Sequence, residues 1–364
     1  MGRDEGLLGV GLAVCAAAIV GVMLLPAKGS GRIIDSDPVR DGPESDGEAE
    51  PEVTITPPPR AGSLKPVRAH LLPDGGPGTV DAQSKVLVSF GWGSSKAQLG
   101  RARPRDGQPE APMSVAADAA GNTWVLDQVN SRIVRLGGEA PIPVGLRKPR
   151  DLAVAKNGNA IVVSESTALV LGGDGHQVAE WKLPLKPEGV YADGDDVYVG
   201  LEGGATMRIG DTLGAADAQR PELPGWPTRD GRSYVSATLA DGARGRVVVM
   251  GFDRASKERR FIREIAFGMP VMNVLLIDSD AAGVIYLAAM GERVPGGGYL
   301  AEPVPVVDLL CLDPIDGKPL SRTELPANTS ADETTREMAA LPGGGVVYLL
   351  RSEGGAELRR VDCR

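Results

Sequence analysis

The chain has 364 residues, of which 42% are apolar, so it is long enough to bury one large hydrophobic core or two ordinary ones. Its formal net charge of -9 at pH 7 excludes a general attraction to nucleic acid, because a phosphate-binding surface needs an excess of Lys and Arg. Only 4% of the residues are aromatic, whereas the 49 glycines and 29 prolines indicate either low complexity or a β fold with many turns.

The N-terminal segment is predicted to be a membrane anchor. Leu7 to Leu25 form an uncharged apolar run, which as a helix roughly matches the ~30 Å hydrocarbon layer of a bilayer. A cleaved signal peptide is the alternative, but its apolar region is usually shorter, about 7 to 15 residues, and ends in an Ala-x-Ala-like site. Because short N-terminal tails usually stay in the cytoplasm, we expect residues 1–28 to anchor the chain in a bacterial inner membrane, with the folded part in the periplasm.

Residues 29–83 are predicted to form a disordered linker. The segment is dense in Pro, Gly, Asp and Glu and shows no apolar periodicity. Such a sequence cannot bury enough apolar surface to offset the entropy lost on ordering. Its expected role is to give the folded domain reach from the membrane.

From residue 84 onward the sequence repeats one pattern, an apolar run, a turn built on Gly with Asn or Asp, and a β-branched run. The pattern is clearest in PMSVAADAAGNTWVLDQVNSRIVRL at 112–136, and it recurs after Pro149, Pro187, Val271 and Glu337. Gly and Asn at such turns tolerate the positive φ that tight hairpins need. A third strand is expected after each hairpin, and fourth strands are expected near residues 178, 258 and 318.

Repeats of roughly 35 to 55 residues with four short strands are typical of β-propeller blades. A more divergent repeat at Pro224–Phe267 brings the predicted number of blades to six. The last repeat ends after three strands, whereas SKVLVSFGW at Ser84–Trp92 is a strand that precedes the first repeat. We therefore expect an all-β, six-bladed β-propeller over residues 84–364, closed by the N-terminal strand in the last blade so that its edge is paired.

The first repeat resembles the NHL repeat, a blade family with Gly-Asn at the first turn and Asp-x-x-Asn-x-Arg at the second. The matching residues are FGWG at 90–93, Gly121-Asn122, and Asp127 with Asn130 and Arg132. The second repeat matches in part, and the others keep only the hairpin rhythm. The resemblance implies a six-bladed NHL-like propeller but no particular function, because this fold is found in binding proteins and in enzymes. We expect Arg132 to pair with nearby carboxylate or carbonyl groups.

The long connections are expected to lie on one face of the ring, the face shared by loops before the innermost strands and loops between second and third strands. These connections are Gly91–Met113, Asp211–Gly231, Met290–Pro303 and Ala327–Thr335. Long loops on a rigid scaffold are where function usually lies. The segment KAQLGRARPR at 96–105 is either a solvated loop or a site for an anionic ligand, a glycan or an acidic partner. The candidate partner-binding residues are Lys96, Arg101, Arg103, Arg105, Arg293 and Tyr299.

The sequence offers little support for catalysis. Its only histidines are His70 and His176, which nearly excludes histidine-based metal sites and Ser-His-Asp triads. The enzymatic alternative is a calcium-dependent lactonase or esterase resembling the six-bladed gluconolactonase group, which binds calcium through Glu, Asn and Asp near the central channel. Glu188 and Asn273 are the candidate ligands, although the sequences around them do not carry that group's full motif. We expect no catalytic residue and no cofactor, with calcium as the alternative.

The cysteines permit one disulfide outside the membrane. Cys15 lies in the apolar run, which leaves Cys311 and Cys363 in adjacent repeats. In an exported domain they either pair or remain two small buried side chains. The predicted function is a protein interaction or scaffold module of the cell envelope that binds a protein or envelope partner through its long-loop face. The alternative is the calcium-dependent hydrolase.

Overall fold

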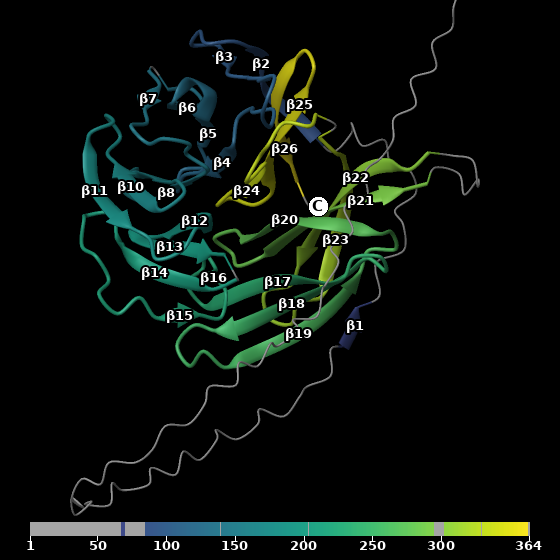
Figure 1. Cartoon of the computed structure of the whole chain (residues 1–364). Helices are drawn as coiled ribbons and strands as arrows, with labels where there is room; N and C mark the ends of the chain where they lie inside the picture. Colours follow the sequence, from purple (N-terminus) through teal and green to yellow (C-terminus); the bar gives the residue numbers. More distant parts are fainter. Residues whose placement is uncertain are drawn as a thin grey trace, which may run out of the picture. The chain divides into compact units, whose positions relative to one another are not determined.

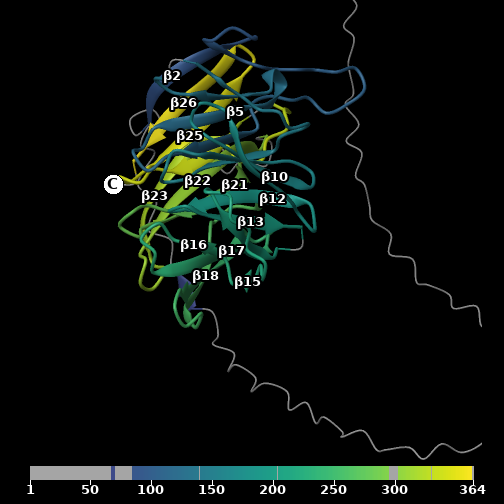
Figure 2. The same cartoon turned by 90° about the vertical axis from the view of Figure 1, so that its left-hand side faces the viewer.

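The computed structural model describes residues 67–69, 84–138, 140–202, 204–294, 302–328 and 330–362. These residues form six mainly antiparallel sheets arranged as blades around a central axis (Figures 1 and 2). The predicted six-bladed β-propeller is therefore confirmed. The described part of the chain contains no helix long and apolar enough to cross a membrane. The predicted anchor at residues 1–28 lies outside the described residues.

The first three blades have four strands each, numbered along the chain from the centre of the ring outward (Figure 1). Blade 1 consists of β4 (Ser114–Ala117), β5 (Thr123–Asp127), β6 (Arg132–Arg135) and β7 (Ile142–Pro143). Blade 2 consists of β8 (Asp151–Val154), β9 (Ala160–Val163), β10 (Thr167–Leu171) and β11 (Gln177–Lys182). Blade 3 consists of β12 (Pro187–Asp193), β13 (Asp196–Leu201), β14 (Thr206–Asp211) and β15 (Glu222–Leu223).

The other three blades have longer strands, and two of them gain a fifth strand. Blade 4 consists of β16 (Trp226–Pro227), β17 (Ser233–Asp241), β18 (Arg246–Asp253) and β19 (Arg259–Ala266), with β1 (Val67–Ala69) added outside β19. Blade 5 consists of β20 (Val271–Ser279), β21 (Ile285–Arg293), β22 (Val304–Leu312) and β23 (Pro319–Pro326). Blade 6 consists of β24 (Met338–Ala340), β25 (Val346–Ser352), β26 (Gly355–Val361), β2 (Ser84–Trp92) and β3 (Gln98–Leu99).

The ring closes as the sequence predicts, within blade 6. The N-terminal strand β2 runs antiparallel to β26, with Ser84 opposite Val361 and Phe90 opposite Ala356. Without β2 the sheet of blade 6 would end at β26 and expose an unpaired edge. We refer to this strand pair and the side chains around it as the closure.

The motif that resembles an NHL repeat holds the chain that leads from the closure into blade 1. Asp127 accepts hydrogen bonds from Arg132 Nε at 2.8 Å, from Asn130 Nδ2 at 2.8 Å and from the Gly100 amide at 2.9 Å. The Arg132 guanidinium also donates to three main-chain carbonyls between Ser94 and Gln98. The predicted pairing of Arg132 is confirmed, and its role is structural.

One short strand departs from the prediction that residues 29–83 form a linker without structure. Residues Val67–Ala69 pair in parallel with β19, with Val67 opposite Arg263 and Ala69 opposite Ile265. The sequence here is too short for a periodic pattern, and an open sheet edge can order a segment that is not intrinsically extended. The rest of the predicted linker up to residue 83 lies outside the described residues.

The apolar side chains of neighbouring blades form the core, and one of the six junctions is much thinner than the others. Five junctions hold between twelve and fourteen buried apolar residues each among the described residues. The junction of blades 3 and 4 holds four, Tyr191, Tyr198, Leu223 and Tyr234, with Trp226 and Phe252 partly buried against them. We call this junction the seam.

Cys311 lies in β22 and is disulfide-bonded. It is therefore not the free buried thiol that the sequence left as one alternative. Its predicted partner, Cys363, lies outside the described residues.

Candidate functional site

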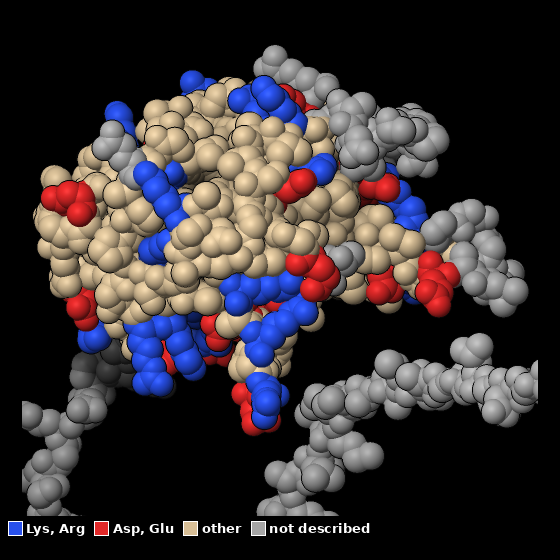
Figure 3. Space-filling view, turned by 90° about the horizontal axis from the view of Figure 1, so that it is seen from above, with Lys and Arg blue, Asp and Glu red and all other residues tan. Residues whose placement is uncertain are grey.

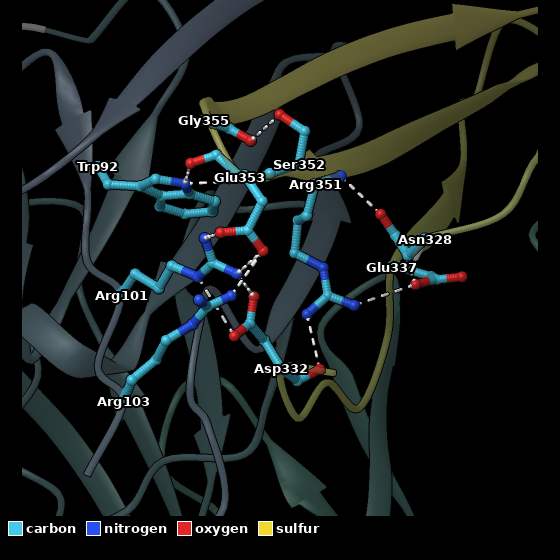
Figure 4. A network of polar contacts seen from close by, with 10 residues as sticks. All are labelled: Trp92, Arg101, Arg103, Asn328, Asp332, Glu337, Arg351, Ser352, Glu353 and Gly355. Carbon is cyan, nitrogen blue, oxygen red and sulfur yellow. Dashed lines mark hydrogen bonds and ion pairs between the residues drawn. The ribbon is translucent and has the colours of Figure 1, made fainter. Parts of the chain in front are cut away.

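Two arginines of the predicted basic loop, Arg101 and Arg103, pair with acidic residues that are distant in sequence (Figure 4). Arg101 has an almost buried side chain, 8% exposed, and its Nη2 lies 3.1 Å from Asp332 Oδ2 and 3.2 Å from Glu353 Oε1. Its guanidinium also stacks over the Trp92 ring, 5.1 Å from the ring centre. Arg101 is thus a structural residue of the closure and is not free to bind an anion.

Arg103 is the second cation of this network. Its Nη2 lies 2.7 Å from Glu353 Oε1, and both side chains are at least half exposed. Arg103 and then Arg101 hold the pKa of Glu353 below its ordinary value, which shows that the carboxylate is shared between two cations. Trp92 Nε1 donates to the Ser352 and Glu353 carbonyls and thereby fixes the turn that carries this carboxylate.

A buried ion pair lies behind these residues. Arg351, 3% exposed, donates through Nη1 to the Asp332 carbonyl at 3.0 Å and lies 3.5 Å from Glu337 Oε2. Asn328 Nδ2 donates to the same carboxylate oxygen at 2.5 Å. Burial raises the pKa of Glu337, against the opposing effects of Asn328 and Arg351. The network therefore contains a carboxylate whose charge depends on its partners.

The other predicted partner-binding residues do not share one environment. Lys96 and Arg105 are exposed and make no ion pair with any residue that the structure describes. Arg293, at the end of β21, pairs with Glu324 and lies 3.7 Å from the buried Asp308. Tyr299 lies outside the described residues. Of the described candidates, Lys96, Arg103 and Arg105 therefore present exposed charge, and Figure 3 shows that Lys and Arg are interspersed with Asp and Glu on one side of the molecule.

Two of the predicted long connections lie side by side and form what we call the loop platform, residues 93–113 and 330–337. Within the first, the Ala102 and Glu110 amides and carbonyls bond reciprocally at 2.8 and 2.9 Å. Between the two, the Glu333 amide donates to the Pro109 carbonyl at 2.8 Å and the Arg336 amide to the Met113 carbonyl at 3.1 Å. Main-chain hydrogen bonds thus give these loops a fixed shape.

The central channel below the platform contains a pair of arginines that the sequence did not reveal. Arg336 Nη2 donates at 2.6 Å to both Asp151 Oδ2 and the Val190 carbonyl. Asp151 is fully buried and also accepts from the Ser114 hydroxyl at 2.5 Å and from the Val190 amide at 2.8 Å. One carboxylate therefore joins the inner strands of blades 1, 2 and 3. Its only sequence signal is an Asp that begins an apolar inner strand.

The second arginine of the channel is Arg229. Its Nη2 lies 3.2 Å from the buried Asp278, and its guanidinium stacks over Tyr191 at 5.4 Å from the ring centre. Burial raises the pKa of Tyr191 well above its ordinary value, so its hydroxyl stays protonated. Tyr191, Arg229 and Arg336 line a cavity of about 10 Å³ together with small residues of the inner strands. The cavity offers room for about one water molecule.

The two candidate calcium ligands do not line the channel cavity. Glu188 and Asn273, the candidate ligands, are exposed residues of β12 and β20. The side chains described here include no group of three or more His, Cys, Asp or Glu placed to hold a metal. The two guanidinium groups that line the channel are each paired with a buried carboxylate, Arg336 with Asp151 and Arg229 with Asp278.

The seam combines aromatic rings with arginines. Arg254 pairs with Asp193, donates to the Tyr198 hydroxyl at 3.3 Å and lies over the Tyr234 ring. The Trp226 ring fits closely against Gly200, where a Cβ atom would approach the ring to 2.8 Å. In a chain with few aromatic residues, this concentration at one junction is unusual, and it was not recognisable from spacing because its members come from five different strands.

Comparisons with known proteins find similar solved structures at low sequence identity. No family model and no curated protein matches the chain, so the NHL likeness remains a resemblance of the first blade. Among solved structures, a streptogramin B lyase is similar at a TM-score of 0.41 and 11% identity, over 77% of this chain and 99% of that one. BamB from Moraxella catarrhalis is similar at a TM-score of 0.35 and 12% identity, over 76% and 99% of the two chains. Regucalcin from Agrobacterium tumefaciens is similar at a TM-score of 0.39 and 14% identity, over 70% and 92%.

Proposed function

We propose that the protein is a membrane-tethered, exported propeller that binds a protein or envelope partner through its loop platform and serves as a scaffold in the cell envelope. The observation that carries the proposal is the fixed shape of the platform, whose two segments are joined by main-chain hydrogen bonds and flanked by ion pairs. A surface that is ordered before binding loses little conformational entropy on binding.

The residues that we propose to contact the partner are different from those that hold the platform in place. Lys96 and Arg105 are exposed and carry charge that no described carboxylate neutralises, so they are available to a partner. Arg101 holds the platform in position, because its charge is already satisfied by Asp332 and Glu353. An acidic partner surface is the complement that these cations favour, and its contacts will weaken as salt increases.

A pull-down from solubilised membranes tests the proposal. The variant Lys96→Glu/Arg105→Glu should recover less partner than the wild type while unfolding at the same temperature. The matched control is Lys156→Glu/Lys318→Glu, which makes the same change of charge at hairpin turns away from the platform. Equal recovery by the platform variant and the wild type would overturn the platform as the binding surface.

Export is the second part of the proposal, and two features support it. The apolar run at Leu7–Leu25 is long enough for a membrane anchor. Cys311 is disulfide-bonded, and disulfides persist mainly in oxidising compartments. Protease added to intact spheroplasts should digest the propeller, whereas protection until the membrane is lysed would place the propeller in the cytoplasm.

A further inference from the structure

The buried carboxylate of Asp151 is in contact with both parts of the loop platform. Its Oδ1 accepts from the Ser114 hydroxyl at 2.5 Å, and its Oδ2 accepts from Arg336 Nη2 at 2.6 Å. Ser114 directly follows the first segment of the platform, residues 93–113, and Arg336 belongs to the second, residues 330–337. One side chain of blade 2 is therefore a common contact of two loops that are far apart in the sequence.

The main chain joins the same residues a second time. Ser114 and Arg336 form a parallel β-bridge, in which the Val115 amide donates to the Arg336 carbonyl at 3.0 Å and the Arg336 amide donates to the Met113 carbonyl at 3.1 Å. Because the side chains of Ser114 and Arg336 also meet at Asp151, a shift of either segment relative to blade 2 would break a contact of the buried carboxylate.

Close packing leaves this carboxylate little freedom to change partners. The Val190 amide donates to Asp151 Oδ2 at 2.8 Å, and Arg336 Nη2 also donates to the Val190 carbonyl at 2.6 Å. A Cβ atom at Gly189 would approach Asp151 Oδ2 to 3.2 Å and Arg336 Nη2 to 3.5 Å. Leaving one member of a buried ion pair without its partner is strongly destabilising, so the pair keeps its geometry.

A second ion pair between the platform and blade 2 is expected to matter less. Glu333 Oε1 lies 3.3 Å from Arg150 Nη2, and both side chains are partly exposed. Exposed ion pairs contribute little to stability, because water and salt screen their attraction. The buried contacts of Asp151 are therefore the stronger connection between the platform and blade 2.

We propose that Asp151 is a positioning residue of the loop platform, which sets the relative position of the two platform segments from within the channel. Hydrogen bonds between the segments give the loops their local shape, and Asp151 holds both loops against blade 2. The importance of this anchor for binding rests on the proposed function, whereas the anchor itself is testable without a partner.

Native-state hydrogen exchange of the full chain in detergent tests the anchor. Asp151→Asn replaces one acceptor oxygen by an NH₂ group, so the side chain can no longer accept from both Ser114 and Arg336. The Glu333 amide donates to the first platform segment, and the Val115 amide donates to the Arg336 carbonyl. Both amides should exchange at least about tenfold faster than in the wild type, because the platform opens locally.

The matched control is Asp308→Asn in blade 5. Asp308 is also fully buried, and its Oδ2 lies 2.6 Å from Arg322 Nη2. This variant loses a comparable ion pair, so it should speed exchange of the platform amides only through global unfolding, which urea unfolding of each variant measures. If the platform amides exchanged no faster in Asp151→Asn than in Asp308→Asn after this correction, the anchor would be overturned.

Two further variants test the same contacts and apply even if Asp151→Asn does not fold. Ser114→Ala removes only the hydroxyl and should speed exchange of the Val115 amide several-fold. Arg336→Met should do the same for the Glu333 amide, and adding Asp151→Asn to it should not speed exchange further, because both changes break one contact. Unchanged exchange in the single variants, or a further increase in the double variant, would overturn the anchor.

The pull-down from solubilised membranes separates this inference from the proposed function. If the platform is the binding surface, Asp151→Asn should recover less partner than Asp308→Asn. Faster platform exchange with equal recovery would support the anchor and contradict the platform as the binding surface. Unchanged platform exchange would overturn the anchor whatever the recovery.

Discussion

The closure and the seam each join two parts of the ring, but they do so with different interactions. The junction of blades 6 and 1 contains twelve buried apolar residues, and the Arg101 and Arg351 networks lie beside it. The seam contains four buried apolar residues, three of them tyrosines, and relies on arginines stacked on rings.

The difference follows from how the chain runs. No peptide link joins β26 to β2, so strand pairing and buried ion pairs must hold the two together. The chain itself runs from β15 of blade 3 into β16 of blade 4 through residues 224–225, so the seam is held covalently as well. The seam has the fewest buried apolar residues of the described junctions, so we expect blade 4 to open more readily than the blades beside the closure.

The largest expected effect is on the buried ion pair of the closure. Arg351→Met should lower the free energy of unfolding by about 3 to 5 kcal/mol, because it leaves the buried Glu337 without its cation. Arg147→Met, which removes an exposed arginine without an ion pair or ring contact to any described residue, should change it by less than about 0.5 kcal/mol. Urea unfolding measures both, and a small effect of Arg351→Met would show that the closure does not depend on this pair.

Leucine truncations compare the two junctions directly. Leu99→Ala in the fully buried core beside the closure should cost about 3 kcal/mol, whereas Leu223→Ala in the seam should cost about 1 to 2 kcal/mol, because the short strand β15 can collapse into the space. The same urea experiment applies. Equal costs would remove the distinction between the junctions.

The arginine contacts of the seam should have a smaller effect. Arg254→Met removes the pair with Asp193 and the contact with the Tyr234 ring, both at a partly exposed position. We expect a loss of about 1 kcal/mol in unfolding free energy. A loss as large as that of Arg351→Met would mean that the seam is held as firmly as the closure.

The smallest expected effect is on how the free energy of unfolding depends on pH. Two carboxylates, Glu337 and Asp217, should change this dependence in opposite directions. Burial raises the pKa of Glu337, so its ionisation opposes folding, and its contribution to stability falls as the pH rises above the ordinary value of 4.5. The stability of Glu337→Gln relative to the wild type should therefore rise with pH across that range. Arg208 lowers the pKa of Asp217, so its contribution is present above the ordinary value of 3.8 and lost as the pH falls.

The stability of Asp217→Asn relative to the wild type should accordingly fall as the pH rises. Thermal melts of both variants and the wild type between pH 3 and 7 measure the two differences. Trends of the same sign would show that the surroundings of Glu337 do not disfavour its charge.

The features that could be predicted from the sequence are those that depend on local sequence pattern. Six blades, the closing strand and the pairing of Arg132 follow from hairpin turns and from residues a few positions apart. The partners of Arg101 lie 231 and 252 residues away, so no spacing could show that its charge is neutralised. The two-residue strands β3, β7, β15 and β16 are too short to have a period, and the channel arginines become neighbours only when the ring forms.

Native-state hydrogen exchange tests the central comparison most directly, because it reports the free energy of opening for each segment. We predict that amides of β17 and β18 next to the seam exchange through openings of lower free energy than amides paired between β2 and β26. If β2 and β26 opened first, the closure would be the weaker junction, and the account of how this ring is held together would be contradicted.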